Sequence, residues 1–274
     1  MCQKLATHLK KNTTHKLTLQ NILIATVSLF WLNGCTSQNV NDKPIVYQES
    51  YDEVKIDTLV LYSLSVVNKY SGDQETYLNH VLAVTNEIFS NSKTNTHFDV
   101  VKIAFLAEIN DTTTPIETLD VLRTNGNIST MRQNTRADEV LIYRDYYGGK
   151  GACGIGYQNT NLLKEYAYAL MGVECETSST AHEIGHNFGN SHSHLQDQAE
   201  GAVYNGYATG HIIENNFGTV MTYAHTFNAE SKYLFSSPSL ICNGEPCGIE
   251  AGEASEADAS RKIREVKKTI SNFY

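Results

Sequence analysis

The hydrophobic and polar positions after residue 56 form two kinds of segment. Runs rich in Leu, Val and Ile predict strands, and the stretches between them predict helices. A helix that begins after Asp73 has apolar residues at helical spacing, and a second helical region at 116–135 is interrupted near Gly126. The predicted strands cover 57–67, 98–106 and 138–143. Strands that alternate with helices predict an α/β sheet with a parallel component.

The pattern is weaker in the second half of the chain. Two short strands are predicted at 152–158 and 166–173, after a Gly-rich turn at 148–151. This turn is not a phosphate loop, because it lacks the GxxxxGK[ST] pattern and a following helix. The apolar residues from Ala259 to Phe273 recur every three or four positions, with acids before them and bases near the end. We expect a C-terminal helix packed on the domain, since a narrow apolar stripe fits burial better than a membrane surface.

The first 35 residues have the pattern of a secretory signal. Four lysines precede the apolar run from Ile22 to Leu32, and eleven helical residues reach only about 16 Å, too short for a membrane span. The run ends in Leu-Asn-Gly-Cys35, which resembles a bacterial lipobox and implies a lipidated Cys35. An uncleaved anchor and full secretion are the alternatives. The absence of Asp at position 36 favours the outer membrane, on its periplasmic or outer face.

The predicted organisation is a signal peptide at 1–35, a polar tether at 36–55 and one catalytic domain at 56–274. Hydrophobic residues make up 41% and charged residues 19%, as in a folded globular protein. The net charge is −9, and the N-terminal lysines make the remainder more acidic still. An acidic surface of this kind excludes nucleic acid and anionic membranes as binding partners, because both carry negative charge.

Export would place the cysteines in an oxidising compartment. Cys2 would be removed and Cys35 lipidated, which leaves four cysteines and three possible connectivities. The segment from Cys242 to Cys247 contains turn-forming residues, so a local bridge is easy there, and Cys153–Cys175 would then remain. Metal-binding thiolates are the alternative, although the chain has no CxxC pair.

The segment from His182 to His192 carries the chemistry. It reads HEIGHNFGNSH and matches HExxHxxGxxH at every fixed position. His182 and His186 are four residues apart, so on a helix both project from one face and can bind one metal ion. Gly189 can end the helix in the left-handed conformation, which would return His192 as the third ligand. Glu183 stands beside the first ligand, where it could take a proton from a metal-bound water.

This donor set predicts a single catalytic Zn²⁺, because three neutral imidazoles leave one position open for water. Bound water has a pKa of about 7, and the ion polarises a carbonyl. Glu183 would then act as general base and later protonate the leaving amine. The structural alternative for Glu183 is a capping box with Thr180, which would not explain three histidines in register.

The same segment resembles the zinc-binding signature of the metzincin clan of metalloendopeptidases. That clan has a methionine-containing turn beneath the metal, and residues 218–223, GTVMTY, stand in that place. The resemblance implies that Met221 packs under the zinc. Tyr223 matches the position at which astacins and serralysins have a tyrosine that approaches the metal or the oxyanion; a buried core tyrosine is the alternative. Residues 181–189, AHEIGHNFG, resemble the reprolysin/adamalysin group, although Ser193 stands where that group has Asp.

The metzincin resemblance implies an α/β (α+β) catalytic domain divided by a cleft. A mixed twisted sheet with helices would precede the zinc-binding helix, and an irregular C-terminal part would end in a helix. The edge strand near Gly154 to Tyr157 would pair with an extended protein or peptide substrate. His194 competes with His192 as a ligand but breaks the spacing, His225 is a candidate for the substrate pocket, and His211 has no assigned role.

We therefore interpret the chain as a zinc-dependent endopeptidase, anchored by lipid through Cys35 and monomeric. A catalytically silent metzincin-fold binding or adhesion lipoprotein is the alternative, against which the retained Glu183 argues. A zinc hydrolase for a non-peptide substrate is a third possibility. The sequence leaves the cleavage preference, the mechanism of latency and any Ca²⁺ requirement open.

Overall fold

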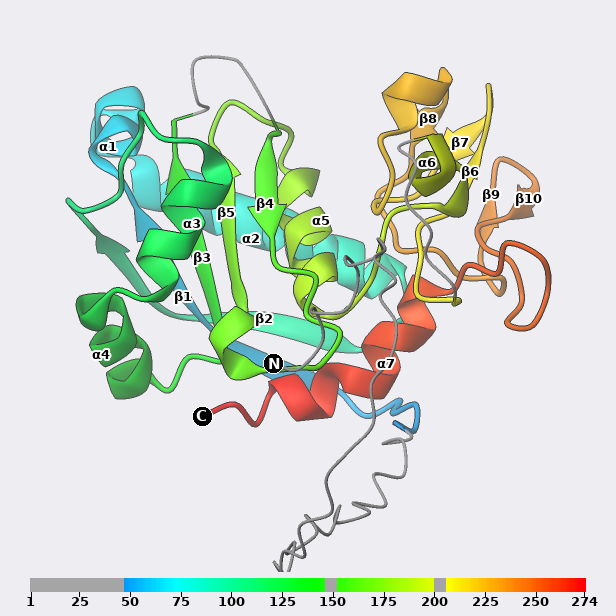
Figure 1. Ribbon diagram of the computed structural model, residues 1–274, viewed down its shortest axis with the longest axis horizontal. Helices are drawn as coiled ribbons and strands as arrows, with labels where there is room; N and C mark the ends of the chain where they lie inside the picture. Colours follow the sequence, from blue (N-terminus) through cyan, green and yellow to red (C-terminus); the bar gives the residue numbers. More distant parts are fainter. Residues whose placement is uncertain (1–46, 146–151, 200–205) are drawn as a thin grey trace, which may run out of the picture. The chain divides into compact units, whose positions relative to one another are not determined.

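A five-stranded sheet forms the centre of the domain (Figure 1). The computed structural model describes residues 47–145, 152–199 and 206–274, so the signal peptide, Cys35 and the turn at 148–151 lie outside it. The strand order is β2-β1-β3-β5-β4, and only β4, at one edge, runs antiparallel to its neighbour. The strands are β1 (Val54–Tyr62), β2 (Thr96–Phe105), β3 (Glu139–Arg144), β4 (Gly154–Gly156) and β5 (Tyr168–Gly172). This mixed sheet confirms the predicted fold class.

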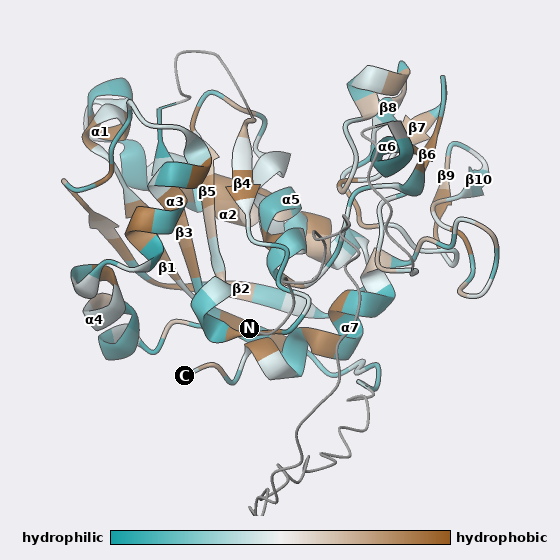
Figure 2. Ribbon diagram, viewed as in Figure 1, coloured by the Kyte–Doolittle hydropathy of each residue, from teal (hydrophilic) through white to brown (hydrophobic). Residues whose placement is uncertain are grey.

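Helices cover both faces of the sheet. Those that contribute to the larger core are α1 (Leu64–Tyr70), α2 (Gln74–Asn91), α5 (Ser178–Asn187) and α7 (Ala259–Ile270). The opposite face is covered by α3 (Pro115–Arg123) and α4 (Gly126–Thr135). In β3, Leu141 and Tyr143 face the first core while Val140 and Ile142 face the second. The centre of β3, from Val140 to Tyr143, is therefore apolar, while Glu139 and Arg144 stand at its ends; Figure 2 accordingly shows brown strands in the sheet.

The prediction of the first strand was wrong at its C-terminal end. The sequence predicted a strand over 57–67, but β1 ends at Tyr62 and α1 begins at Leu64. The chain turns at Ser63, whose hydroxyl donates to Asp111, as does that of Ser65. The apolar run fits a strand and a helix equally well, so its hydropathy could not locate this turn.

The other predicted elements are confirmed with small shifts. Helix α2 follows Asp73, although this residue makes no side-chain capping bond. The break near Gly126 separates α3 from α4, because the Asn125 side chain accepts hydrogen bonds from two backbone N–H groups at the start of α4. The stripe on α7 is buried as predicted, from Ala259 to Ile270.

The part of the chain after α5 consists mainly of loops with short elements. It contains α6 (His194–Ala199), β6 (Ile212–Ile213), β7 (Phe217–Gly218), β8 (Glu230–Ser231), β9 (Ile241–Cys242) and β10 (Glu245–Pro246). Both predicted disulfides, Cys153–Cys175 and Cys242–Cys247, are present. None of the helices in the described part of the chain combines the length and the apolar character that a membrane span requires.

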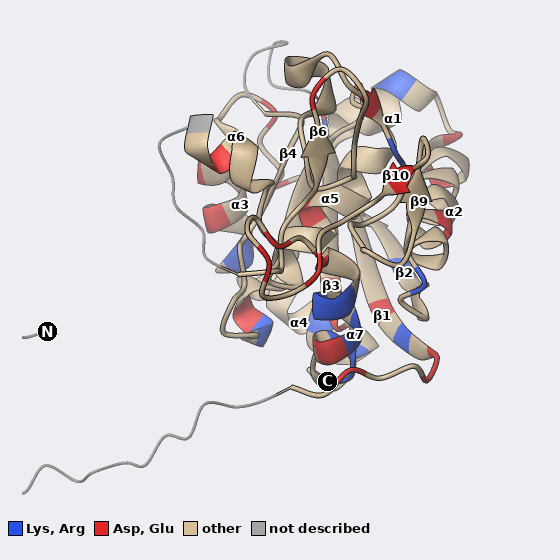
Figure 3. Cartoon of the chain, turned by 90° about the vertical axis from the view of Figure 1, so that its right-hand side faces the viewer, with Lys and Arg blue, Asp and Glu red and all other residues tan. Residues whose placement is uncertain are grey.

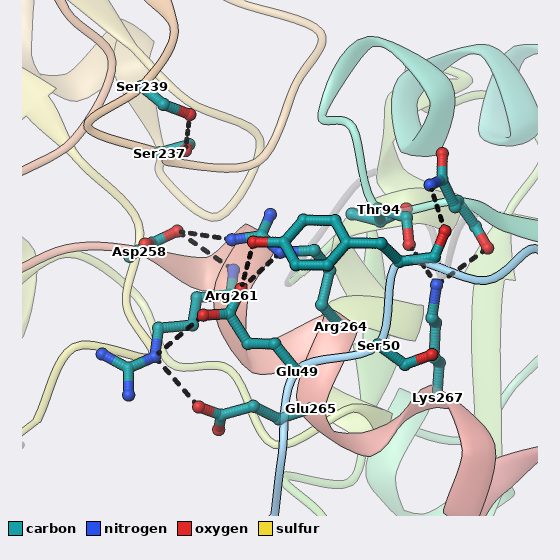
Figure 4. Close-up of polar contacts among 12 residues, drawn as sticks. Glu49, Ser50, Thr94, Ser237, Ser239, Asp258, Arg261, Arg264, Glu265 and Lys267 are labelled. Carbon is teal, nitrogen blue, oxygen red and sulfur yellow. Dashed lines mark hydrogen bonds and ion pairs between the residues drawn. The ribbon is translucent and has the colours of Figure 1, made fainter.

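Helix α7 also holds the start of the described chain. Glu49 accepts a hydrogen bond from Arg264 Nε at 2.7 Å, and Ser50 N donates to the Arg264 carbonyl at 3.0 Å (Figure 4). Lys267 Nζ donates to the carbonyls of Asp52 and Thr94 at 2.6 and 2.7 Å. Helix α7 has five basic residues and one acid, Glu265, and Figure 3 shows blue and red segments on it. The predicted domain start at residue 56 stays a prediction; β1 begins two residues earlier.

Candidate active site

Helix α5 carries the first two histidines of the motif. It begins at Ser178 with Thr177 as N-cap, so Thr180 lies inside the helix and its hydroxyl bonds to that of Tyr143 at 3.0 Å. The capping-box interpretation of Thr180 and Glu183 was therefore wrong. Glu183 instead lies one turn inside the helix, next to His182.

The three motif histidines converge on one point. Their candidate ligand nitrogens all lie within 4.8 Å of one another, and the Nε2 atoms of His182 and His192 are 3.2 Å apart. The turn depends on Gly189, which has φ +83°, a conformation that side chains other than hydrogen rarely adopt. The three histidines that the motif predicted as ligands of one ion are thus close together in the folded chain.

Backbone carbonyls orient two of the three rings. His182 Nδ1 donates to Val220 O at 2.7 Å, and His186 Nδ1 donates to Asn190 O at 2.9 Å. A proton on Nδ1 leaves the Nε2 lone pair available for a metal ion. Burial lowers the pKa of all three histidines, with the proximity of the other rings adding to the effect at His182 and His192, and that of His192 falls to about 4. Neutral imidazoles at these distances fit Zn²⁺.

Glu183 is a buried carboxyl beside this triad. Its side chain is 6% exposed, and burial raises its pKa to about 8, with a smaller opposing effect from the Gly156 backbone N–H. A divalent cation at the histidines would favour the carboxylate form and lower this pKa. The group therefore lies where its protonation state responds to a metal ion.

Two glycines of β4 allow this strand to approach α5 closely. A Cβ on Gly154 would lie 2.7 Å from both Cγ and Oε1 of Glu183, and one on Gly156 would overlap the Glu183 carbonyl. The Cys153–Cys175 disulfide and the bond from Gly172 N to Cys153 O at 2.8 Å fix the same edge. Any side chain at position 154 would displace Glu183.

Met221 packs beneath the same helix. It is fully buried, and its sulfur lies where a Cβ on Gly185 would be, with Phe235 also in contact range. Because Gly185 lies between His182 and His186, this contact joins the helix that bears two histidines to the turn that follows strand β7.

Comparison with known proteins agrees with this geometry. The sequence pattern of metallo-peptidase family M12 matches residues 52–235, which is more than half of the chain. The chain belongs to family M12. The match begins just before β1 and ends at Phe235, so it includes the sheet, the histidine motif and the Met221 turn.

Three curated relatives share the name peptidyl-Asp metalloendopeptidase. Those of Pseudomonas aeruginosa and Stenotrophomonas maltophilia are 28% identical to this chain, and that of Xanthomonas campestris is 26% identical. Each alignment covers 80% of this chain but only 40%, 52% and 51% of the relative. The chain thus spans about half the length of these relatives or less. Their names do not favour the binding-only alternative.

A solved structure supports the fold. A chain titled "Structure of a chaperone-substrate complex" superposes with a TM-score of 0.65 at 21% identity, over 81% of this chain and 35% of that one. At this identity the likeness extends to the architecture alone, which is the mixed sheet with covering helices.

Tyr223 lies beside the M12 histidines. Its ring centroid is 4.9 Å from that of His192 and 5.6 Å from that of His182, where the two rings are stacked. Its backbone N–H donates to Gln196 Oε1 at 2.9 Å, which fixes the turn. At 36% exposed it is not a buried core residue, so the structural alternative for Tyr223 was wrong.

The other histidines have separate surroundings. His194 Nε2 contacts the carbonyls of Gly206 and Glu256, so it does not join the triad. His211 packs its ring against Phe217. His225 lines the cavity described next, as the sequence suggested.

A cavity of about 630 Å³ opens beside the triad. Its walls come from β4, the first turns of α5 and the residues after Met221, and include Gly154, Glu183, Tyr223, His225 and Lys232. The sequence analysis missed Lys232, because a single lysine in an irregular segment has no pattern. It also missed the Val220 and Asn190 carbonyls, since every residue has a carbonyl and only the fold selects those two.

Proposed function

We propose that this M12 chain is a zinc-dependent endopeptidase. The observation that carries the proposal is the convergence of three histidine nitrogens within 4.8 Å, beside a buried glutamate and a cavity. Binding alone would not require Glu183 at this position. The relatives named as metalloendopeptidases support the same conclusion, although the chain matches only part of each.

In the proposed site, His182, His186 and His192 hold the Zn²⁺ through Nε2. The carbonyls of Val220 and Asn190 keep two of the rings in the required tautomer. When bound, zinc supplies a Lewis acid that polarises the substrate carbonyl and brings the pKa of water to about 7.

Glu183 moves the proton in this proposal. Its carboxylate takes a proton from the attacking water and delivers it to the nitrogen of the leaving amine, so that one C–N bond breaks and one C–O bond forms. The position of Tyr223 against His192 supports a second role, in which its hydroxyl donates to the developing oxyanion.

The substrate would bind in extended form along β4. This strand is at the edge of the sheet, so its outer side can add a further strand through backbone hydrogen bonds. The name of the relatives supports a preference for bonds next to Asp. Calcium is not part of the proposal.

The proposed location is outside the cytoplasm. The two disulfides indicate an exported protein, since such bonds persist in oxidising compartments. The lipobox-like sequence supports a lipid anchor at Cys35, with the outer membrane favoured, and we propose a monomer.

The decisive experiment combines metal analysis with protein digestion. Wild type should contain one zinc per chain and digest an unfolded protein, and a chelator should abolish digestion. Glu183→Gln should keep the zinc but lose about 10²- to 10⁴-fold in rate, which is the usual contribution of a general base. Glu165→Gln, an exposed glutamate, is the matched control and should retain full activity. Zinc with no digestion by wild type would support the binding-only alternative.

A further inference from the structure

The cavity beside the triad has a permanent positive charge in its wall. Lys232 lines it and, among the described residues that do so, is the only lysine or arginine. Its backbone N–H donates to Gly218 O at 2.8 Å, which ties it to the strand before Met221. The side chain is 21% exposed. An aliphatic stem buried to this extent limits where the ammonium group can go.

The ion-pair partner of Lys232 faces the solvent. Glu230 Oε2 lies 2.7 Å from Lys232 Nζ, but the Glu230 side chain is 61% exposed. Asn243 Nδ2 donates to the same oxygen at 3.1 Å. These two contacts lower the pKa of Glu230, Lys232 having the larger effect. An exposed pair of this kind contributes little stability, so a ligand carboxylate could replace Glu230 at small cost.

The other charged groups around the cavity are less suited than Lys232 to bind a ligand carboxylate. Glu183 and His182 belong to the proposed catalytic site, and Glu176 on the α5 side is exposed and would repel an acidic ligand. His225 also lines the cavity. Apart from the proposed metal site, Lys232 is therefore the one lysine or arginine among the described lining residues that can attract a carboxylate.

We propose that Lys232 binds the carboxylate of an acidic substrate residue next to the scissile bond and so selects Asp-containing peptides. This inference rests on the proposed endopeptidase function and adds the residue that determines its specificity. Lys232 makes a charge-assisted hydrogen bond to the side chain that enters the cavity, and Glu230 competes for Lys232 when no substrate is bound.

The test uses the specificity ratio of matched peptides. A quenched peptide is prepared with Asp, Glu, Asn or Lys at the residue flanking the cleaved bond, and kcat/KM is measured for each. Wild type should prefer Asp over Asn. Lys232→Met should lower the Asp/Asn ratio by about 10- to 100-fold, the range for losing a hydrogen bond to a charged group, while cleavage of the Asn peptide changes little. Lys232→Arg should retain most of the ratio.

Glu230→Gln provides an independent readout of opposite sign. It removes the charge that competes with the substrate carboxylate, so the Asp/Asn ratio should rise by about 1.5- to 5-fold, in the range of an exposed ion pair. Lys55→Met is the control, because Lys55 is an exposed lysine paired with Asp99 between β1 and β2, and it changes net charge alone. Its ratio should equal that of wild type.

The outcomes separate the two proposals. No cleavage of any peptide by zinc-loaded wild type would overturn the endopeptidase function and, with it, this inference. Cleavage with an Asp/Asn ratio that Lys232→Met leaves unchanged would overturn the role of Lys232 alone. If Lys232→Met does not fold, Glu230→Gln decides, and an unchanged ratio there overturns the inference.

Discussion

The two regions on either side of Asn187 hold the site in different ways. The sheet region buries strands on both faces, and its two cores contain most of the large apolar side chains. The region after α5 contributes Met221, Phe235 and helix α7 to the larger core, and has a small core of its own around Phe217 and the Cys242–Cys247 bridge. It positions His192, Met221 and Lys232 mainly through backbone hydrogen bonds and tight turns. The proposed active site thus has one wall fixed by the sheet and a second wall that depends on local contacts.

An aromatic cluster joins the two regions, and its removal should have the largest effect. Phe89 on α2 is fully buried, and its ring lies 5.9 Å from Phe188 and 4.8 Å from Phe235. Phe89→Ala should lower the free energy of unfolding by about 3–5 kcal/mol, because it leaves a cavity between the regions. Urea denaturation measures this. Phe105→Ala, a residue 45% exposed on β2, should cost less than about 1 kcal/mol, and equal losses would contradict this view of the interface.

Removal of the disulfide in the sheet region should have a larger effect than removal of the disulfide in the region after α5. Removing Cys153–Cys175 by a double Ala variant should cost about 3 kcal/mol, and removing Cys242–Cys247 about 2 kcal/mol, since the first closes a loop of separation 22 and the second one of separation 5. Proteolytic activity should fall only in the first variant, because that bond fixes β4 next to Glu183. Thermal unfolding and a digestion assay on both variants check this. Loss of activity only in the variant without Cys242–Cys247 would contradict this prediction.

Gly185 tests the contact between α5 and the Met221 turn. Gly185→Ala should cost about 1–3 kcal/mol by overpacking and should weaken zinc binding, because the new methyl group would displace Met221 and Phe235. Gly126→Ala is the matched control, with nothing within 4 Å of the added Cβ. Zinc affinity by competition with a chelator is the measurement. Equal affinity in both variants would show that Met221 does not support the metal ligands.

The smallest expected effect concerns a buried acid in the sheet region. Glu139 on β3 is fully buried, neither carboxylate oxygen has a hydrogen-bond partner, and burial raises its pKa to about 8. The folded protein therefore holds this proton more tightly than the unfolded chain. Its contribution to stability is present below pH 4.5 and is lost as the pH rises through about 8.

Glu139→Gln should remove this pH dependence. We expect a gain of about 1 kcal/mol at pH 7.5, because the amide cannot ionise but still has to be desolvated. Urea denaturation between pH 5 and pH 8.5 compares the two proteins. Parallel stability profiles would mean that Glu139 is not the titrating group.

The sequence predicted the sheet region well because buried strands and helices have a regular pattern of apolar residues. The centre of β3 is a short apolar run, Val140 to Tyr143, and α7 shows its stripe at spacings of three and four. The end of β1 was missed because the turn at Ser63 depends on Asp111, a partner far away in the chain. The sequence indicated the three histidines and Glu183 because metal binding imposes a fixed spacing on α5 and on the turn after it. It did not indicate the close approach of Gly154 and Gly185 to their neighbours or the place of Lys232 in the cavity wall, since these exist only after folding.

Under the proposed function, the Cys153–Cys175 bond would also make activity depend on the compartment in which the chain folds. The cytoplasm keeps thiols reduced, so a newly made chain there would lack the link that fixes β4 beside Glu183. The edge would then be held by a three-residue strand and by the hydrogen bond from Gly172 N to Cys153 O. Under the proposed endopeptidase function, the cell would thereby be protected from digestion of its own proteins until the chain has crossed into an oxidising compartment.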